Sequence, residues 1–162
     1  MKLFHGSDVI VDFPKIIQDS RPLDFGSGFY TTSNEEQARV WASIIAFRRY
    51  ASERFISVYD FDIETAKTKL KIIKFEKPDE RWLDFICLNR SGKYAGNYDI
   101  AIGPVANDKV YQVVSYYENG TYDKQEALKR LKVVELYNQV LFHTKESLRY
   151  LKFQKAIEVQ YE

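Results

Sequence analysis

Strand-like and helix-like segments follow one another in this chain without regular alternation. Apolar or alternating runs predict strands at residues 2–5, 28–31, 55–61, 70–75, 98–104, 139–143 and 154–160. Helical periodicity predicts a helix that begins after Ser33 and further helices at 79–90, 107–118, 123–132 and 144–151. A doubly wound parallel sheet requires strands and helices that alternate, so this order predicts an α+β fold.

Composition indicates one soluble domain spanning residues 1–162. The 162 residues are enough for a single core, and 45% are hydrophobic against 29% charged. The net charge of +1 gives no global field that would attract nucleic acid or an anionic membrane. With one cysteine, Cys87, no apolar leader and no run long enough to span a bilayer, we expect a cytoplasmic protein without membrane association.

Two of the expected helices carry local signals. Ser33 and Glu36 predict an N-cap with a capping box. The inward face of that helix is predicted to carry Ala38, Trp41, Ala42 and Ile45, and that of the 79–90 helix Trp82, Phe85, Ile86 and Leu88.

Three short segments contain the residues best suited to a binding site. His5 ends a strand and is followed by Gly6, the residue type used where backbone must approach a ligand closely, and by Ser7. A second segment, residues 24–30, contains Gly26 and Gly28 before Tyr30, but it lacks the third glycine and following helix of a dinucleotide-binding loop. Its glycines would turn the chain tightly, and its aromatic ring would stack on a flat ligand. Taken alone, either segment also fits an ordinary strand end or a hairpin turn.

The third segment places Gln139 at the start of a strand, after Tyr137 and Asn138. In this order the segments resemble the signature of the ADP-ribosyltransferases that are similar to poly(ADP-ribose) polymerase. That signature combines a His in His-Gly-Ser, a Tyr after a Gly-x-Gly turn, and a polar residue, usually Glu, on a late strand. The chain also resembles, over nearly its whole length, the bacterial domain family DUF3990.

The resemblance implies the ADP-ribosyltransferase fold, in which two small antiparallel or mixed sheets pack as a split β-sandwich around an NAD cleft and are flanked by short helices. It implies NAD as co-substrate, with no metal, and a macromolecular acceptor, either protein or nucleic acid. It further suggests the toxin of a bacterial toxin–antitoxin pair, with the antitoxin as a protein partner.

Carried over residue by residue, the resemblance assigns binding roles. His5 donates a hydrogen bond to the adenosine ribose, and Gly6 presents its backbone N–H and C=O to the nicotinamide carboxamide. Ser7 and Gly28 belong to the same NAD-contacting segments. Tyr30 stacks on nicotinamide, and Trp41, eleven residues later, is a candidate for the other side of the ring. The alternative for Trp41 is a core position. Where the family usually has a serine that binds the carboxamide, this chain has Ala38, so Thr31 or Thr32 is expected to substitute.

Gln139 decides what chemistry such a site could perform. Its carbonyl oxygen can accept a hydrogen bond from the ribose 2′-hydroxyl, but the amide cannot supply charge or act as a base. The catalytic assignment is therefore His5, Tyr30 and Gln139, with mono-ADP-ribosyl transfer as the expected activity. A borrowed carboxylate, from the target or from Glu135 or Asp24, is the other way to supply the charge. The alternatives to a transferase are a non-catalytic NAD or ADP-ribose binding module and, more distantly, an RNA 2′-phosphotransferase on the same fold.

Other features point to structure more than to chemistry. The lysines between residues 67 and 77 fit an exposed strand edge, with a nucleic-acid surface as the minority interpretation. His143 follows a strand and is interpreted as incidental, and Cys87 as buried and unreactive. Two His and one Cys, widely scattered, make no zinc site.

Overall fold

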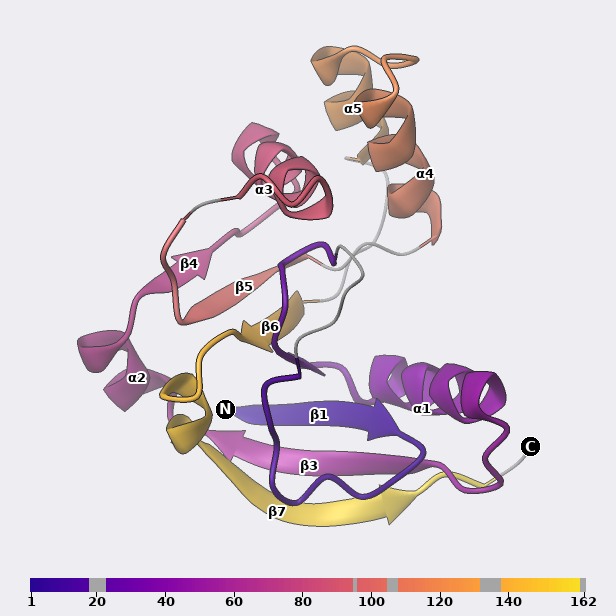
Figure 1. Cartoon of the computed structure of the whole chain (residues 1–162), viewed down its shortest axis with the longest axis vertical. Helices are drawn as coiled ribbons and strands as arrows, with labels where there is room; N and C mark the ends of the chain where they lie inside the picture. The colour runs from indigo at the N-terminus through magenta and orange to yellow at the C-terminus, as the bar shows by residue number, and fades with distance from the viewer. Residues whose placement is uncertain (18–22, 95, 105–107, 132–137, 161–162) are drawn as a thin grey trace.

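The protein is built on one mixed β-sheet with helices on its flanks (Figure 1). A computed structural model describes residues 1–17, 23–94, 96–104, 108–131 and 138–160. The strands are β1 (Lys2–Ser7), β2 (Phe29–Thr32), β3 (Phe55–Phe61), β4 (Ile72–Lys74), β5 (Ile100–Pro104), β6 (Asn138–Phe142) and β7 (Leu151–Glu158). The helices are α1 (Glu35–Arg49), α2 (Ile63–Lys69), α3 (Glu80–Arg90), α4 (Asp108–Glu118), α5 (Lys124–Leu131) and a 3₁₀ turn, η1 (Ser147–Tyr150).

The seven strands run in the order β4-β5-β6-β2-β1-β3-β7, and only β4 and β5 are parallel. This confirms the α+β class. The expectation of two separate sheets is wrong, because β2 pairs with β6 on one side and with β1 on the other. The β1–β2 pairing is nevertheless minimal, since Phe4 opposite Thr32 is its one paired position among the described residues. We call this position the β1–β2 junction.

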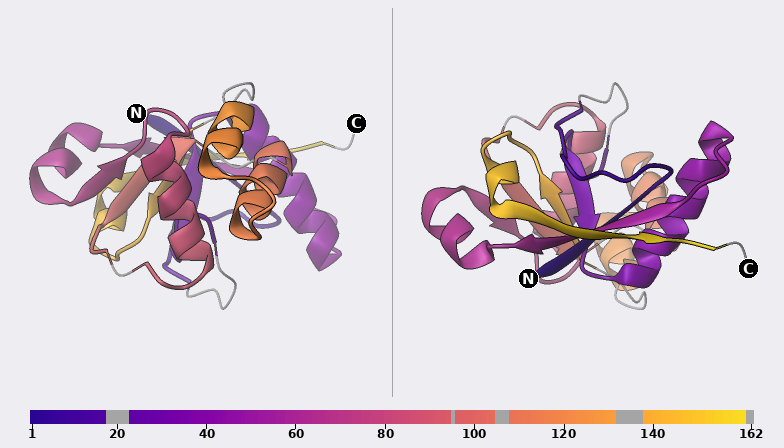
Figure 2. Two further views of the ribbon diagram at one scale, coloured as in Figure 1. Left: turned by 90° about the horizontal axis from the view of Figure 1, so that it is seen from above. Right: turned by 90° about the horizontal axis from the view of Figure 1, so that it is seen from below.

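The junction divides the sheet into two halves, each covered by its own helices (Figures 1 and 2). Helix α1 contacts β1 and β3, whereas α3, α4 and α5 gather beside the half that contains β4, β5 and β6. Within the described ranges, none of the helices combines the length and apolar character that a bilayer crossing demands.

Helix α1 begins one residue later than predicted. Asn34, not Ser33, is the N-cap: its side chain accepts a hydrogen bond from the Gln37 amide at 2.9 Å. The predicted capping box is therefore wrong, and Glu36 instead pairs with Arg39. The helix buries Ala38, Ala42 and Ala46, small residues that allow a close approach to β1.

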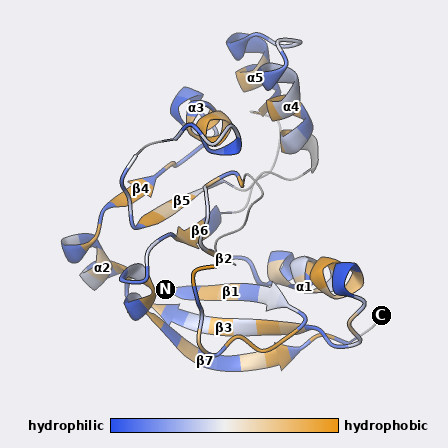
Figure 3. Cartoon of the chain, viewed as in Figure 1, coloured by the Kyte–Doolittle hydropathy of each residue, from blue (hydrophilic) through white to orange (hydrophobic). Residues whose placement is uncertain are grey.

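The described core forms three clusters, and Figure 3 shows strongly hydrophobic stretches in β4 and β5. In α3, capped by Asp79, the predicted inward residues Trp82, Phe85 and Ile86 are buried. Leu88 is 41% exposed, because at about 100° per residue it falls outside the arc that the buried residues occupy.

The remaining differences concern short polar segments. Helix α2 was not predicted, since its sequence buries only Ala66 and so shows no helical repeat of apolar residues. Strand β4 is shorter than the predicted 70–75 run. The predicted helix at 144–151 is the single turn η1, so β7 begins at Leu151 and ends at Glu158.

Candidate functional site

His5 lies beside the junction and links the two halves of the sheet. Its Nδ1 atom is 2.7 Å from the carbonyl oxygen of Tyr30 in β2. A carbonyl oxygen only accepts, so Nδ1 carries the proton. Burial lowers the pKa of His5, the positive charge of Arg49 lowers it further, and the Tyr30 bond only partly opposes them. The ring is therefore neutral and Nε2 is a hydrogen-bond acceptor, which reverses the donor role expected toward a ribose hydroxyl.

Phe29 fixes the other side of the histidine ring. The two ring centroids are 4.5 Å apart, and Phe29 in turn meets Tyr59 edge-on at 5.8 Å. Phe29 was not among the predicted site residues, although it occupies the apolar position next to Tyr30 in the motif. This position in the motif is the sequence signal that could have identified Phe29 as a site residue.

The backbone of Gly6 is turned toward β2. Met1 and Phe61 exchange two backbone hydrogen bonds, at 2.6 and 2.8 Å, so they form a hydrogen-bonded pair of the β1–β3 ladder. Such pairs alternate along an antiparallel ladder, which makes His5 a hydrogen-bonded position and Gly6 a non-bonded one. The N–H and C=O of Gly6 therefore face away from β3, beyond the last β1–β2 pair of the described residues. This is the orientation that the expected carboxamide contact requires.

A second constraint explains why residue 6 is glycine. A Cβ built at Gly6 would lie 1.9 Å from the carbonyl oxygen of Ala38 and 2.7 Å from the amide nitrogen of Ala42. Both are backbone atoms of α1, which cannot rotate aside. Gly6 thus lets α1 seat directly on β1, independently of any ligand.

The glycine turn before β2 has the tight geometry that was predicted. Gly26 has φ +86° and Gly28 φ +154°, and a Cβ at Gly28 would lie 2.3 Å from the Phe142 carbonyl oxygen. The Tyr30 hydroxyl donates to the Gly26 carbonyl at 2.6 Å and accepts from the Phe25 amide at 3.2 Å. The turn therefore fixes the position of the half-buried tyrosine ring.

Trp41 is not a core residue. It is 44% exposed on α1, whose buried face consists of alanines, so the core alternative for this tryptophan is wrong. The indole makes no aromatic ring contact with any described residue. An exposed, unstacked ring is the state that a ligand-stacking role requires before the ligand binds.

Three other predicted contact residues, Thr31, Thr32 and Ser7, already form side-chain hydrogen bonds. The Thr31 hydroxyl donates its one proton to the Val140 carbonyl at 2.8 Å, so Thr31 is not the substitute carboxamide donor. The Thr32 hydroxyl has two acceptors within reach of its one proton, Gln37 Oε1 and the Asn138 carbonyl oxygen, and it accepts from the Asn34 amide at 3.1 Å. The Ser7 hydroxyl donates to Asp8 at 3.1 Å, and Asp8 binds Arg49 at 2.8 Å. This chain of contacts joins the end of β1 to the end of α1, and no sequence pattern indicated it.

Gln139 lies near the start of β6, as predicted, and β6 is an interior strand of the sheet between β5 and β2. It stands opposite Thr32 of β2 on one side and Gly103 of β5 on the other, and it is 8% exposed. Its amide has no side-chain hydrogen-bond partner among the described residues. A nearly buried amide can form up to four hydrogen bonds, so this group is well suited to bind a ligand.

The side chains approach the junction from both faces of the sheet. Directly paired residues share a face, so Gln139, Thr32 and Tyr30 lie on one face. The pairing of Phe4 with Thr32 places His5 on the opposite face. The three predicted catalytic residues therefore surround the junction without meeting on one surface.

Asp24 does not supply a carboxylate to the site. It binds Arg90 at 2.6 Å, and the Arg90 guanidinium also lies 4.5 Å over the Tyr111 ring and 3.7 Å from Glu118. These contacts tie the glycine turn to α3 and α4. Glu135 and Tyr137 lie outside the described residues.

The remaining candidates are structural. His143 Nδ1 binds the Ser27 carbonyl at 2.6 Å and its ring stacks on Tyr98. Cys87 is only partly buried, which differs from the expected buried position, but this burial still raises the pKa of its thiol to about 12, so little reactive thiolate forms at neutral pH. In the described part of the chain, no three His, Cys, Asp or Glu side chains gather as metal ligands.

Comparison with known proteins gives one family. A family model described as "Protein of unknown function (DUF3990)" matches residues 1–153. Searches of curated proteins and of solved structures return no match to the chain.

Proposed function

The chain belongs to the DUF3990 family, whose function is unknown, and we propose that it is an NAD-dependent mono-ADP-ribosyltransferase with its site at the β1–β2 junction. One observation carries the proposal: His5, Gly6 and Gln139 all present hydrogen-bonding groups there that the described part of the fold leaves unused. The proposal also includes an ADP-ribosyltransferase fold whose two half-sheets are joined at the β1–β2 junction, an NAD cleft and a toxin–antitoxin role, all drawn from the three-segment resemblance.

The binding roles follow from the hydrogen-bonding groups. The Nε2 atom of His5 accepts from a hydroxyl of the adenosine ribose, while Nδ1 stays bound to Tyr30. The N–H and C=O of Gly6 pair with the carboxamide, which has one donor group and one acceptor group. Tyr30 and Trp41 supply aromatic faces for the cationic nicotinamide ring, a contribution of about 0.5–2 kcal/mol.

The transfer step breaks the bond between the ribose C1′ and the nicotinamide nitrogen. The bonding electron pair stays on nicotinamide, which leaves as a neutral molecule and needs no proton. C1′ becomes oxocarbenium-like and bonds to the acceptor, which releases its proton to solvent. Gln139 accepts a bond from the ribose 2′-hydroxyl and so orients the sugar, but it offers no negative charge to the transition state.

The missing charge favours transfer to an acceptor that is already nucleophilic, and it favours single transfer over polymer growth. It is also the specific observation in favour of a second function, an NAD or ADP-ribose binding module without turnover. The transferase turns NAD over and the binding module does not, whereas both bind NAD.

The test incubates the protein with NAD labelled on its adenylate phosphate in a cell lysate and follows the label into protein and nucleic acid. His5→Ala is the test variant. His143→Ala is its matched control, because both histidines bind a backbone carbonyl through Nδ1 but only His5 lies at the junction. Label that transfers with the wild type and the control, but not with His5→Ala, supports the transferase.

Gln139→Glu separates the two functions. In a transferase the added carboxylate raises the rate roughly tenfold or more, whereas a binding module without turnover gains little. Calorimetric titration with NAD completes the test. No heat of NAD binding, with all proteins folded by circular dichroism, refutes both functions.

A further inference from the structure

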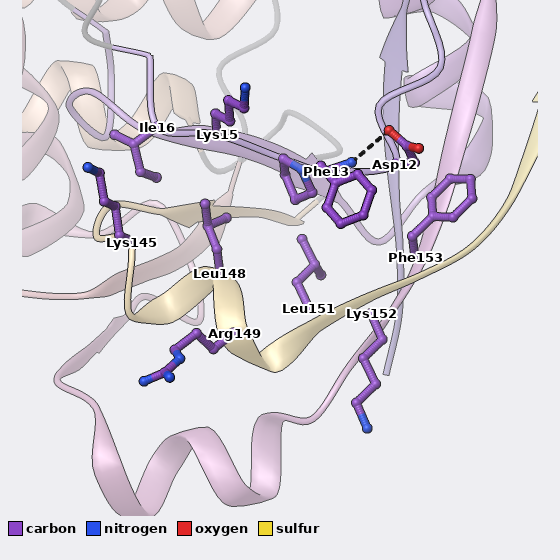
Figure 4. A pocket seen from close by; sticks show the side chains of 11 residues that line it. Asp12, Phe13, Lys15, Ile16, Lys145, Leu148, Arg149, Leu151, Lys152 and Phe153 are labelled. Atoms are coloured by element: carbon purple, nitrogen blue, oxygen red, sulfur yellow. Dashed lines mark hydrogen bonds between the residues drawn. The ribbon is translucent and has the colours of Figure 1, made fainter.

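A second candidate site lies at the edge of the sheet that is formed by β7. Segment 12–16 runs across η1 and the start of β7, and the pocket between them has a volume of about 990 Å³ (Figure 4). In the strand order, β1 and β3 separate β7 from β2, so this pocket is distinct from the junction. Its lining consists of Asp12, Phe13, Pro14, Lys15, Ile16, Lys145, Leu148, Arg149, Leu151, Lys152 and Phe153.

The middle of the pocket is apolar. Leu148 and Leu151 face Ile16 and Phe13 across it in Figure 4, and Phe153 lies toward one end. Ile16, Leu148 and Phe153 pack against a core cluster and are only partly buried, while Phe13 is 81% exposed. These side chains leave a mainly aliphatic surface, of a size usual for small-molecule sites.

The segment that forms one wall is anchored to the sheet. The amide of Val11 donates to the Ser57 hydroxyl at 2.9 Å, and the Tyr59 hydroxyl donates to the Val11 carbonyl. The opposite wall is fixed by Ser147, whose hydroxyl donates to the Thr144 carbonyl at 2.6 Å.

Charge is distributed unevenly around the pocket. Arg149 is paired with Glu146 at 3.0 Å, and Lys152 stands opposite Asp60 and points away from the pocket in Figure 4. Lys15 and Lys145 lie toward the same end in that view, and neither has an ion-pair partner among the described residues. Asp12, toward Phe153, accepts a hydrogen bond from the Phe13 amide at 2.9 Å.

From this arrangement we infer that the pocket binds a small amphipathic anion: an aliphatic body that ends in one acidic group. The body lies between Ile16 and Leu148, and the acidic group lies between Lys15 and Lys145. A nucleotide fits less well, because the wall facing the ligand is more aliphatic than aromatic and offers a base little surface for stacking. The acidic group can be a carboxylate or a phosphate, which share the charge and acceptor geometry that lysine recognises.

Calorimetric titration with ligands of matched chain length, below their micelle concentrations, tests this inference. Decanoate and decyl phosphate are the two anionic arms, decan-1-ol the neutral arm and decyltrimethylammonium the cationic arm, with AMP as the nucleotide arm. At least one of the two anions should bind at least about tenfold more tightly than decan-1-ol, decyltrimethylammonium or AMP. The ratio of the two anionic arms identifies the acidic group.

Variants locate the binding. The double change Lys15→Glu with Lys145→Glu should weaken binding at least about tenfold, and Phe13→Ala, at an exposed position, should weaken it less. Lys129→Glu is the matched control, because Lys129 is an exposed lysine of α5 outside the pocket lining, and it should leave binding unchanged. Equal binding of decanol and decanoate, tighter binding of AMP, or insensitivity to the double charge reversal in a folded protein overturns the inference. None of these measurements depends on NAD.

Discussion

Replacing Gly6 with alanine tests the packing that positions the proposed site. The new Cβ would lie 1.9 Å from the Ala38 carbonyl oxygen, where ordinary contacts begin near 3.4 Å, so α1 must move away by about 1.5 Å. Overpacking of this kind costs about 1–3 kcal/mol or more, and the lower entropy of the unfolded alanine chain returns about 0.4–1 kcal/mol. Because the obstacle is helix backbone, we expect a net loss near the top of this range, about 2–3 kcal/mol.

Urea unfolding followed by circular dichroism measures this loss, and the melting temperature should fall by about 4–12 °C. Gly120→Ala is the control, because Gly120 has φ +81° and an added Cβ there would meet nothing within 4 Å, so this variant reports backbone strain alone. Strain there costs about 1 kcal/mol. A Gly6→Ala protein whose unfolding free energy stays within about 0.5 kcal/mol of the wild type would show that α1 does not rest on β1 as described.

Three further predictions concern titration and ion pairing. The folded pKa of His5 is lowered, so the contribution of the neutral ring to stability is complete above about pH 6.5 and is lost as the pH falls below that value. Between pH 7.5 and 5.5, urea unfolding should therefore show a smaller loss of unfolding free energy in His5→Gln than in the wild type. An equal loss in the two proteins contradicts the burial of the ring. Arg90→Ala breaks a mostly buried ion pair with Asp24 and should lower the unfolding free energy in urea by about 2–4 kcal/mol. Lys67→Ala, which breaks an exposed ion pair, should cause no measurable change. Equal effects of the two variants would refute a stabilising role for the Arg90–Asp24 pair. Cys87, with a pKa raised to about 12, should resist iodoacetamide at pH 8 until urea exposes it, and fast modification of the folded protein would contradict this.

A helix or strand could be predicted from the sequence wherever the residues that the fold buries are apolar and repeat with the period of that element. Helix α3 and strands β3, β5 and β6 were predicted because their apolar residues repeat with the period of the buried face. Helix α2 and η1 bury little, so their sequences carry no such period. The cap of α1 depended on a choice between adjacent Ser33 and Asn34, which have nearly equal propensity for that position.

The site was predictable only in part, since motif residues identify positions but not their neighbours. The glycine turn and the location of His5 follow from local sequence. The bond from His5 to Tyr30 and the link through Asp8 to Arg49 join residues that are distant in the chain, and only the folded sheet brings them together. The interior position of Gln139 depended likewise on strand order, which no local pattern specifies.

The order of the strands has a consequence for synthesis. The half of the sheet that holds His5 consists of β1, made first, together with β3 and β7, and β7 pairs with β3 from Phe55 to Phe61. During translation, β1 and β3 are therefore synthesised well before β7, residues 151–158, whereas all the strands of the other half are synthesised before β7 as well. A nascent chain lacking β7 would expose the edge of β3, so the half of the sheet that carries His5 stays open at this edge until residues 151–158 have been translated.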